Sequence, residues 1–468
     1  MAIQPKKAAL ITAGVTVAAG LAYIIYFDYQ RRNNPTLKKK IKKEKIKAKK
    51  EVEKAKEAVK SNALQIIERV LAAADKETMP STPEEKEKYF MEKVAAGEAL
   101  CNRGEASFNE AVLPFYLALK VYPAPMELIM IYQKTIPEPV FQMVINVMAV
   151  DQQKRQNLFY EQFPPKETNV KLAELPAGVN EEGNPVVRRS LAADKDIAEG
   201  ETIYSERPLV SALFPELEGQ HCNLCLKPLS DEQKVECPTC DLIAFCSQDC
   251  LDCANEEYHK YLCSHNKSQE IKEADEADEK NIALEFFETS KSNNNKYPYM
   301  IARFLSAMVI EELNKQKQPA SNESVFGAWD HVDRFRYLET QPSDESKAEI
   351  DMLKQVLGPK VQGISEFLSD DIYLMLKGKL LYNAYGIPAT SEVNLGETKE
   401  HMRTITGTDN KYIGAGLYKI STYIGQSEED PNVKLSFDND KLSVIATKHI
   451  MKGEELLAPY TLPVPKKN

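Results

Sequence analysis

The stretch CNLCLKPLSDEQKVECPTCDLIAFCSQDCLDCANEEYHKYLC, residues 222–263, holds eight of the nine cysteines of this 468-residue chain. Seven of them, together with one histidine, follow the spacing C-x2-C-x11-C-x2-C-x5-C-x3-C-x8-H-x3-C. Disulfide cysteines of secreted chains are scattered in pairs, whereas a dense cluster with C-x-x-C spacing is typical of metal binding in a reducing compartment. The stretch therefore predicts a small module that is held together by metal ions.

The cluster supplies enough ligands for two tetrahedral zinc sites. The eight ligands are Cys222, Cys225, Cys237, Cys240, Cys246, Cys250, His259 and Cys263. Because a closed site with four protein ligands leaves no position for water, we expect two structural zinc ions and no catalytic metal. Cys253, His221 and His265 are left over from this assignment.

The segments FCSQDC (245–250) and YHKYLC (258–263) resemble a MYND zinc finger. The resemblance implies two cross-braced sites, whose ligands alternate in pairs along the chain. One site is then formed by Cys222, Cys225, Cys246 and Cys250, and the other by Cys237, Cys240, His259 and Cys263. MYND fingers often bind short proline-containing motifs, so the resemblance also implies a protein ligand, whose identity is unknown.

The residues on either side of the finger predict one β-rich fold that is interrupted twice. Upstream, residues 196–204 read as a strand, a turn at Glu199-Gly200 and a second strand. Downstream, helical patterns cover about 282–316 and 344–381, and β-like segments follow. We expect an α+β domain made of residues 184–221 and 381–468, interrupted by the finger (222–263) and a helical insertion (264–380).

The sequences SERPLV (205–210), GLY (416–418) and KHIMKGEELLAPY (448–460) resemble the SET-and-MYND family of protein lysine methyltransferases. The match covers about residues 184–464 and implies a SET fold. Active members use S-adenosylmethionine as methyl donor and carry a Gly-x-Gly turn, because only glycine lets the backbone approach the cofactor closely. The matching positions of this chain are Arg188, Arg189 and Ser190.

Two further departures concern the same cofactor. The family's Asn-His pair shapes the cofactor pocket, and Gly425 and Gln426 stand in its place here. Glu428 replaces a zinc-binding cysteine, one extra residue lengthens the loop, and no cysteine follows the finger. Tyr460 matches the tyrosine that lines the methyl-transfer site and is the one vestigial candidate. We therefore expect no catalytic residue and no bound S-adenosylmethionine.

Residues 62–150 predict an all-helical domain. Capping boxes begin helices at Thr82-Pro83-Glu84-Glu85 and at Ser107 with Glu110, and prolines separate the later helices. Two antiparallel helices with small residues at their crossing points resemble one tetratricopeptide unit. Since one unit cannot bury its own apolar face, the other helices must complete the domain.

The sequences YFDYQRRN (26–33) and VYPAPMELIMIYQKTIPEPVFQM (121–143) are similar to the presequence receptor subunit of the mitochondrial outer-membrane translocase, the TOM complex. The resemblance implies a shallow apolar groove for the leucine face of an amphipathic targeting helix. On this chain the groove falls on Phe90, Met91, Val94, Leu128, Ile131 and Tyr132. The first three share one helix face and the last three another, and the alternative that they are core residues stays open. Because presequences are basic, the acidic side chains expected as rim partners are Glu92, Glu98 and Glu127.

Residues 8–27 contain no charge, and twenty helical residues span a bilayer core of roughly 30 Å. A cleaved signal peptide would have a shorter apolar core and a small-residue cleavage site, and charged flanks disfavour a buried core helix. Residues 31–60 carry 14 Lys/Arg against 4 Glu, which predicts that the bulk of the chain faces the cytosol. We expect a transmembrane anchor (1–30) and a basic helical stalk (31–61), with attraction to anionic lipids as a secondary role.

The net charge of −10 shows that this basic run is local, so nucleic acid is not an expected partner. Residues 151–183, with Pro164-Pro165 and Gly178, read as a linker between the receptor part and the SET-like part. The fold class is therefore multidomain: an anchor, an all-α receptor domain, and an α+β SET-like domain with its finger.

Two functions remain. The first is a single-pass import receptor of the mitochondrial outer membrane that binds presequences and passes them to other subunits of the TOM complex, with a non-catalytic SET–MYND interaction module. The second is a membrane-anchored, S-adenosylmethionine-dependent protein lysine methyltransferase, which the SET layout and Tyr460 support. Three lost motifs against one retained residue favour the first.

Overall fold

The computed structural model describes residues 62–80, 83–122, 125–179, 183–240, 242–264, 282–292, 295–317, 326–361, 364–389, 412–427 and 429–459. The chain divides into two compact units. The helical unit extends to Phe159 and includes the segments 312–319 and 361–372, and the sheet unit contains the remainder. The predicted anchor and stalk, residues 1–61, lie outside the described residues, and so do Glu428 and Tyr460.

No helix in the described ranges is both long enough and apolar enough to cross a membrane.

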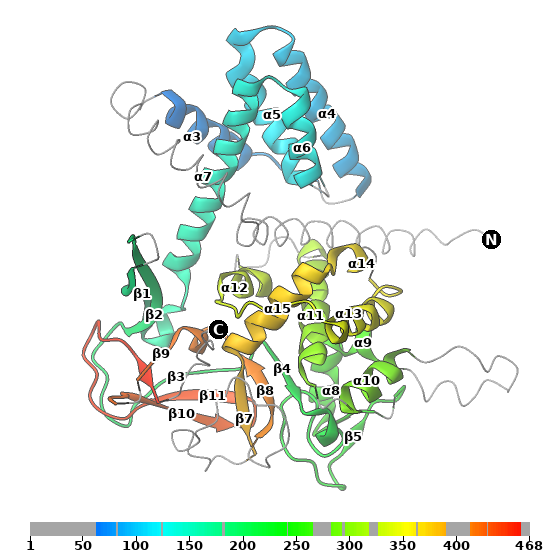
Figure 1. The fold of residues 1–468 in the computed structure, drawn as a ribbon, viewed down its shortest axis with the longest axis vertical. Helices are drawn as coiled ribbons and strands as arrows, with labels where there is room; N and C mark the ends of the chain where they lie inside the picture. Colours follow the sequence, from blue (N-terminus) through cyan, green and yellow to red (C-terminus); the bar gives the residue numbers. More distant parts are fainter. Residues whose placement is uncertain are drawn as a thin grey trace, which may run out of the picture. The chain divides into compact units, whose positions relative to one another are not determined.

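The helical unit is built from helices joined by short connections (Figure 1). They are α3 (Asn62–Ala74), α4 (Pro83–Cys101), α5 (Phe108–Val121), α6 (Pro125–Thr135) and α7 (Glu138–Gln162). The prediction of a helical N-terminal region is thus confirmed. Ser107 precedes α5 but makes no capping hydrogen bond, because it already belongs to a 3-10 turn and its backbone is not extended.

The core of the helical unit shows how closely α4 and α5 pack. A Cβ atom on Gly97 of α4 would lie 2.8 Å from the ring of Phe115, so the phenyl ring of α5 sits directly against the backbone of α4. Phe115 in turn meets Tyr132 of α6 edge to face, with 5.0 Å between the ring centroids. Gly97, Phe115 and Tyr132 therefore join three helices through one buried contact line.

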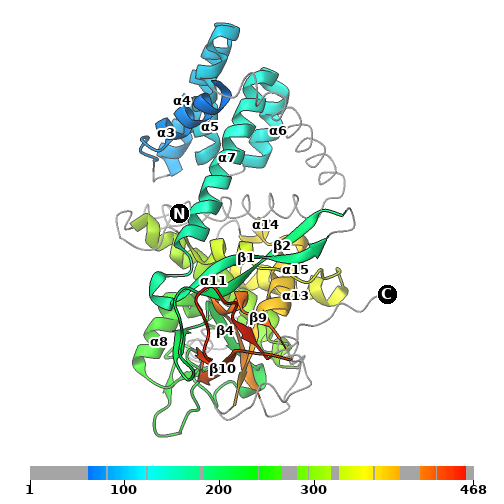
Figure 2. The ribbon, with the colours of Figure 1, turned by 90° about the vertical axis from the view of Figure 1, so that its left-hand side faces the viewer.

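The predicted linker at residues 151–183 is mostly regular structure instead. α7 continues to Gln162, since no proline or glycine occurs between Pro139 and Pro164 to end it. Strand β1 (Val170–Val179) then pairs antiparallel with β2 (Pro185–Ala193), and Figure 2 shows the pair as a long two-stranded ribbon. The alternation that would mark these strands is hidden by prolines and glycines at positions that read as a loop.

The sheet unit contains several small sheets. One has the strand order β10 (Val433–Asp438), β11 (Lys441–Ala446), β3 (Thr202–Glu206), and another has the order β4 (Val210–Leu213), β8 (Tyr412–Leu417), β7 (Tyr385–Pro388). The predicted turn before β3 is present, with Gly200 at φ +81°. Strands from before the finger thus pair with strands from the C-terminal part, as a split fold requires.

The finger and the helical insertion occupy the sequence between β4 and β7 (Figure 1). The finger contains β5 (Val235–Glu236), β6 (Ala244–Phe245), α8 (Gln248–Ala254) and α9 (Lys260–Leu262). The insertion contains α10 (Ile282–Ser292), α11 (Tyr297–Lys317), α12 (Ala328–Arg334), α13 (Asp344–Leu357), α14 (Ile364–Phe367) and α15 (Asp370–Asn383).

Three segments that are far apart in sequence converge beside β2. Strand β12 (Leu457–Ala458) pairs in parallel with β9 (Gly425–Gln426), and Leu456 donates its amide to the carbonyl of Leu191 in β2. The side chain of Asn432 fastens the junction, since it donates to the carbonyl of Glu455 and accepts from the amide of Leu457. This convergence brings two of the altered SET motifs, at 188–190 and 425–426, close to the segment 455–458.

Candidate functional site

The six groove positions predicted on α4 and α6 differ in exposure. Met91 is 62 % exposed and Ile131 48 %, while Phe90 and Val94 are half-buried. Leu128 and Tyr132 are buried, at 3 % and 2 %, because both pack into the core of the helical unit. They therefore support the surface from below and do not form it.

The exposed part of this surface has a further member and an acidic surround. Met130 is 53 % exposed, next to Ile131 on α6, although the sequence pattern did not single it out. Glu92, Glu98 and Glu127 are all exposed. Burial raises the pKa of Tyr132, and Glu98 raises it further, which places this carboxylate of α4 near the side chain of α6. Apolar and acidic side chains of α4 and α6 thus occur together.

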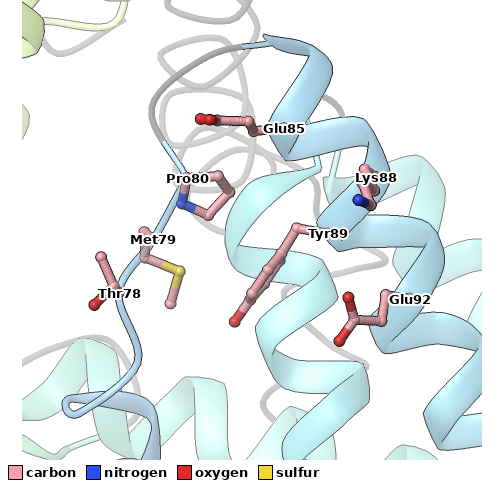
Figure 3. Close-up of a pocket in the computed structure, with 7 residues that line it drawn as sticks. All are labelled: Thr78, Met79, Pro80, Glu85, Lys88, Tyr89 and Glu92. Atoms are coloured by element: carbon pink, nitrogen blue, oxygen red, sulfur yellow. The ribbon is translucent and has the colours of Figure 1, made fainter.

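A pocket of about 410 Å³ lies on a different face of α4 (Figure 3). Figure 3 shows Tyr89 of α4 facing Met79 and Pro80, which belong to the segment after α3. Its full lining is Thr78, Met79, Pro80, Glu85, Lys88, Tyr89 and Glu92. Tyr89 is tied to Glu77, whose carboxylate accepts from its hydroxyl at 3.3 Å. The pocket is thus distinct from the apolar stripe of Phe90, Met91 and Val94.

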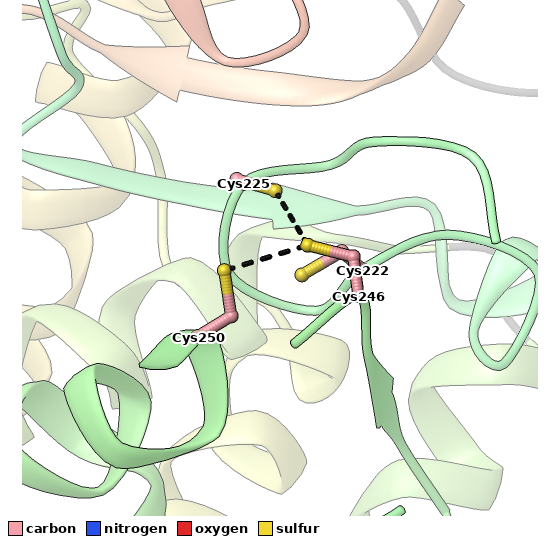
Figure 4. A group of neighbouring side chains, drawn as sticks. All are labelled: Cys222, Cys225, Cys246 and Cys250. Atoms are coloured by element: carbon pink, nitrogen blue, oxygen red, sulfur yellow. Dashed lines mark hydrogen bonds between the residues drawn. The ribbon is translucent and has the colours of Figure 1, made fainter. Parts of the chain in front are cut away.

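The finger brings its eight candidate ligands into two groups of four, of which Figure 4 shows the first. One group is Cys222, Cys225, Cys246 and Cys250, and the other is Cys237, Cys240, His259 and Cys263. Within each group all ligand atoms lie within 4.8 Å of one another. This is the alternating division that the MYND resemblance implied.

The distances inside the groups fit tetrahedral zinc. With zinc–sulfur bonds of about 2.3 Å, two sulfur ligands of a tetrahedron lie about 3.8 Å apart. The Sγ atom of Cys246 lies 3.6 Å from that of Cys225 and 3.5 Å from that of Cys250. In the second group, Nε2 of His259 lies 3.3 Å from Sγ of Cys237 and 3.7 Å from Sγ of Cys240. Both groups can therefore hold a metal ion, and their thiol-rich chemistry suits zinc.

Local backbone conformation and hydrogen bonds position these ligands. Leu226 adopts a left-handed backbone, with φ +63°, and its amide donates to the carbonyl of Cys222, which turns the first Cys-x-x-Cys pair inward. Ser247 caps α8 by accepting from the amide of Cys250 at 3.2 Å. A π-turn at Asn255–His259 then aims the histidine at the second group.

The crowding of thiols also shifts their acidity. Hydrogen bonding to Cys222 raises the pKa of Cys225, and hydrogen bonding to Cys263 raises that of Cys240. Burial raises the pKa of Cys250 to about 11. Because a metal binds the thiolate, binding must release these protons, and the affinity of the finger for metal rises with pH.

A buried arginine ties the first metal group to the body of the sheet unit. Arg303 of α11 is 2 % exposed and donates to the carbonyl oxygens of Ser211 in β4 and Asn223, at 2.8 and 2.9 Å. It also donates to the side chain of Asn223 at 2.7 Å, and Asn223 lies between Cys222 and Cys225. Glu218 completes the charge balance 3.9 Å from Arg303. The finger is thus anchored through the two terminal nitrogens of one buried guanidinium, whose Nε has no hydrogen-bond partner among the described residues.

The altered SET motifs meet at a second ion pair. Arg188 of β2 reaches Glu455 with two parallel hydrogen bonds, of 2.5 and 2.8 Å. The hydroxyl of Ser190 donates to the same carboxylate at 2.6 Å. Hydrogen bonding to Glu455 raises the pKa of Arg188, so this guanidinium stays charged. Arg189 faces elsewhere, pairing with Glu174 and stacking on Tyr160.

Comparison with known proteins assigns the two parts of the chain. Residues 10–161 match the MAS20 protein import receptor family, and residues 188–461 match the SET domain family. The mitochondrial import receptor subunit tom20 of Neurospora crassa is 42 % identical over 151 residues, which cover 32 % of this chain and 83 % of the relative. TOM20 of Saccharomyces cerevisiae is 37 % identical over 141 residues, covering 30 % and 76 %. TOM20 homolog B of Danio rerio is 30 % identical over 149 residues, covering 31 % and 86 %.

The chain belongs to the MAS20 protein import receptor family and, through its second part, to the SET domain family.

A SET domain implies S-adenosylmethionine, and the structure allows a test of whether the residues fit it. At the Gly-x-Gly positions the SET domain of this chain has Arg188 and Ser190, whose side chains are engaged with Glu455. Where the family's pocket has an asparagine stands Gly425, which has no side chain to offer a ligand. These residues do not fit the methyl donor.

Sequence reasoning missed three residues that matter in the two families. Met130 of the MAS20 part could have been found, because it neighbours Ile131 on an exposed turn. Glu455 gave no signal of its own, although an arginine at position 188 should have raised the question of its partner. Arg303 could not be found, since its partners Asn223 and Ser211 are about 80 and 90 residues away.

Proposed function

We propose that this protein is an import receptor that binds the amphipathic targeting sequences of mitochondrial precursors. The single observation that carries the proposal is the exposure of large apolar side chains on two helices of the MAS20 part, Met91 on α4 with Met130 and Ile131 on α6. Membership of the MAS20 family and the names of its relatives support the role. The apolar stripe would take the leucine face of a targeting helix.

The surrounding charge supports a basic ligand. Glu98 and Glu127 are exposed on the same two helices, and carboxylates at the rim attract Lys and Arg side chains of a presequence. Glu92 lines the pocket on the other face of α4 instead. Rim charges contribute mainly to the rate and specificity of association. The buried positions Leu128 and Tyr132 hold the helices in place beneath the contact surface.

The cellular setting follows from the same family. We place residues 1–30 as a single-pass anchor in the mitochondrial outer membrane, residues 31–61 as a stalk, and the bulk of the chain in the cytosol. The receptor domain at 62–150 would pass precursors to other subunits of the TOM complex. Support comes from the relatives, each named a mitochondrial import receptor subunit, and from the uncharged run at 8–27.

For the second part we propose a non-catalytic interaction module. The SET fold would comprise 184–221 and 381–468, with a MYND finger at 222–263 that holds two structural zinc ions and binds an unknown protein ligand. The helical insertion would span 264–380. The geometry of the two ligand groups supports zinc, and the ion pair between Arg188 and Glu455 supports the loss of methyl transfer.

The competing function, a membrane-anchored protein lysine methyltransferase, has one observation in its favour, the SET family match over 188–461. It requires a cofactor that the side chains of Arg188 and Ser190 do not accommodate and to which Gly425 offers no side chain. Tyr460, its vestigial catalytic candidate, lies outside the described residues. We therefore prefer the receptor function.

The receptor function is tested by titrating the full chain, in detergent micelles, with a fluorescent basic amphipathic presequence peptide. We expect saturable binding that Ile131→Asp weakens at least tenfold, because burying a carboxylate in an apolar contact costs roughly several kcal/mol. Leu64→Asp is the matched control, since Leu64 is 52 % exposed on α3, outside the proposed contact surface. Equal affinity for the wild type and Ile131→Asp would refute the groove.

A further inference from the structure

One carboxylate collects the three positions at which this chain departs from the SET cofactor motifs. Glu455 of the Gly-Glu-Glu-Leu-Leu segment accepts two hydrogen bonds from Arg188 and one from Ser190. Both donors stand at the Gly-x-Gly positions of β2. The Glu455 side chain is 18 % exposed and that of Arg188 30 %, so the pair is mostly withdrawn from solvent.

The third position, Gly425, lies directly beneath this carboxylate. A Cβ atom built on Gly425 would come 2.3 Å from Oε1 of Glu455 and 2.8 Å from Cδ2 of Leu457. Contacts below 3.0 Å do not occur at real Cβ atoms, so any side chain at 425 must displace Glu455. The carboxylate therefore stands in the space that the family's asparagine side chain needs.

The carboxylate is not free to swing aside. Its tip is the far end of a flexible side chain, which on its own would yield easily, but three charge-assisted hydrogen bonds hold it in place. Its backbone is fixed as well, because Asn432 donates to the carbonyl of Glu455 and Gly425 donates to that of Leu456. Hydrogen bonds thus hold both the Glu455 carboxylate and the backbone that carries it.

We infer that Arg188, Ser190 and Glu455 form an internal clasp that closes the cofactor cleft of this SET domain, with Gly425 as the residue that makes room for it. The chain fills its own methyl-donor site with a neutral ion pair. The four residues form one interdependent set. The inference rests on the proposed non-catalytic role of the SET domain and names the residues that enforce it.

The first arm of the test is ligand binding by the full, zinc-loaded chain in detergent micelles. Calorimetric titration with S-adenosylmethionine at millimolar concentration should give no saturable heat, and the ligand should not raise the melting temperature. Saturable binding would overturn the clasp. If the same protein also methylated protein substrates, the non-catalytic role would fall with it.

The second arm is a double-mutant cycle between positions 425 and 455, read as melting temperature. Gly425→Ala should lower Tm by ~5 °C in the wild type, and by much less in the Glu455→Ala background, because the obstructing carboxylate is gone. The Arg188→Ala background should relieve Gly425→Ala in part, since it releases the carboxylate without removing it. The control background is Glu174→Ala, which breaks the neighbouring Arg189 pair and should relieve nothing.

Additive effects at 425 and 455 would overturn the clasp. If S-adenosylmethionine binding were also absent, the non-catalytic role would stand without it. Presequence binding by all these variants should equal that of the wild type, so a failure of the receptor function would show separately. Loss of folding in Gly425→Ala alone, with recovery by Glu455→Ala, would be the strongest form of the expected result.

Discussion

The surface of α4 and α6 and the methyl-donor position beside β2 differ in whether a ligand position is open to solvent or filled by side chains of the chain itself. On α4 and α6 the chain leaves Met91 and Ile131 in water, although burying such side chains would stabilise the fold. At β2 the chain fills the ligand position with Arg188, Ser190 and Glu455. The proposed receptor surface thus stays open at a cost in stability, whereas the proposed clasp fills the methyl-donor position with the chain's own residues.

The finger is a third case, because its side chains neither expose an apolar surface nor fill a ligand position, but are spaced to hold metal ions. Its eight ligand atoms have the spacing of two tetrahedra, and Arg303 joins its first Cys-x-x-Cys pair to β4 and α11. Through this contact, loss of the finger's structure should destabilise the sheet unit as well. The comparison therefore predicts a large loss of stability on removal of the metal and a small loss on breaking the clasp.

Metal removal should have the largest effect. Chelation should release two zinc ions per chain and unfold the finger, since structural zinc contributes about 10 kcal/mol or more per site in finger peptides. Mass spectrometry and thermal melting measure the two results. Cys240→Ser should lose one zinc, whereas Cys253→Ser should lose none, because Cys253 is exposed and belongs to neither group. A chelated protein with an unchanged melting curve would contradict a structural role for the metal.

Breaking the arginine anchor should come next. Arg303→Met leaves Glu218 buried without its cation, and breaking a buried pair in this way costs about 3–5 kcal/mol. Urea denaturation measures the loss. The control is Lys347→Met, because Lys347 and its partner Asp344 are both exposed and no buried charge is left behind. Equal losses in the two variants would show that burial of Arg303 is unimportant.

The same network predicts a dependence on pH. Burial raises the pKa of Glu218 from its ordinary 4.5 to about 7, against the lowering effect of Arg303. Because the folded pKa lies above the unfolded one, the stabilisation is complete below about pH 4.5 and is lost as the pH rises through about 7. The loss is about 3 kcal/mol at most. Glu218→Gln should flatten this slope at saturating zinc, and an unchanged slope would assign the dependence to other groups.

The clasp should have the smallest effect on stability. Arg188→Ala removes a pair that is partly exposed, so we expect a loss of about 1 kcal/mol in urea denaturation. Arg189→Ala, whose partner Glu174 is 57 % exposed, should lose less. A loss at Arg188 as large as that at Arg303 would mean that the clasp is a central element of the fold and not a filled site.

The finger and the helical unit could be predicted from the sequence because their signals are local. Ligand spacing places Cys222 and Cys246 with their neighbours, and prolines and apolar periodicity place the helices up to Met148. Strand β1 was misread as part of a linker, since Pro176 and Gly178 are loop signals that a two-stranded ribbon with exposed faces tolerates. Local pattern fails where a strand buries little.

The clasp shows the other limit of sequence reasoning. Comparison of motifs revealed that glycines were replaced at 188 and 190 and an asparagine at 425. It could not show that these changes meet at Glu455, because the contact joins residues more than 260 positions apart. Likewise, burial separated Leu128 and Tyr132 from Met91 and Ile131, which share a periodic pattern but not an exposure.

The most direct test of the account compares one change in each region through a single binding measurement. Fluorescence anisotropy gives the affinity of the full chain for a basic amphipathic presequence peptide. Met91→Asp/Ile131→Asp should weaken it roughly a hundredfold or more, and Arg188→Ala should leave it unchanged. The reverse pattern, with binding intact in the double variant or lost in Arg188→Ala, would contradict the claim that recognition belongs to the helical unit.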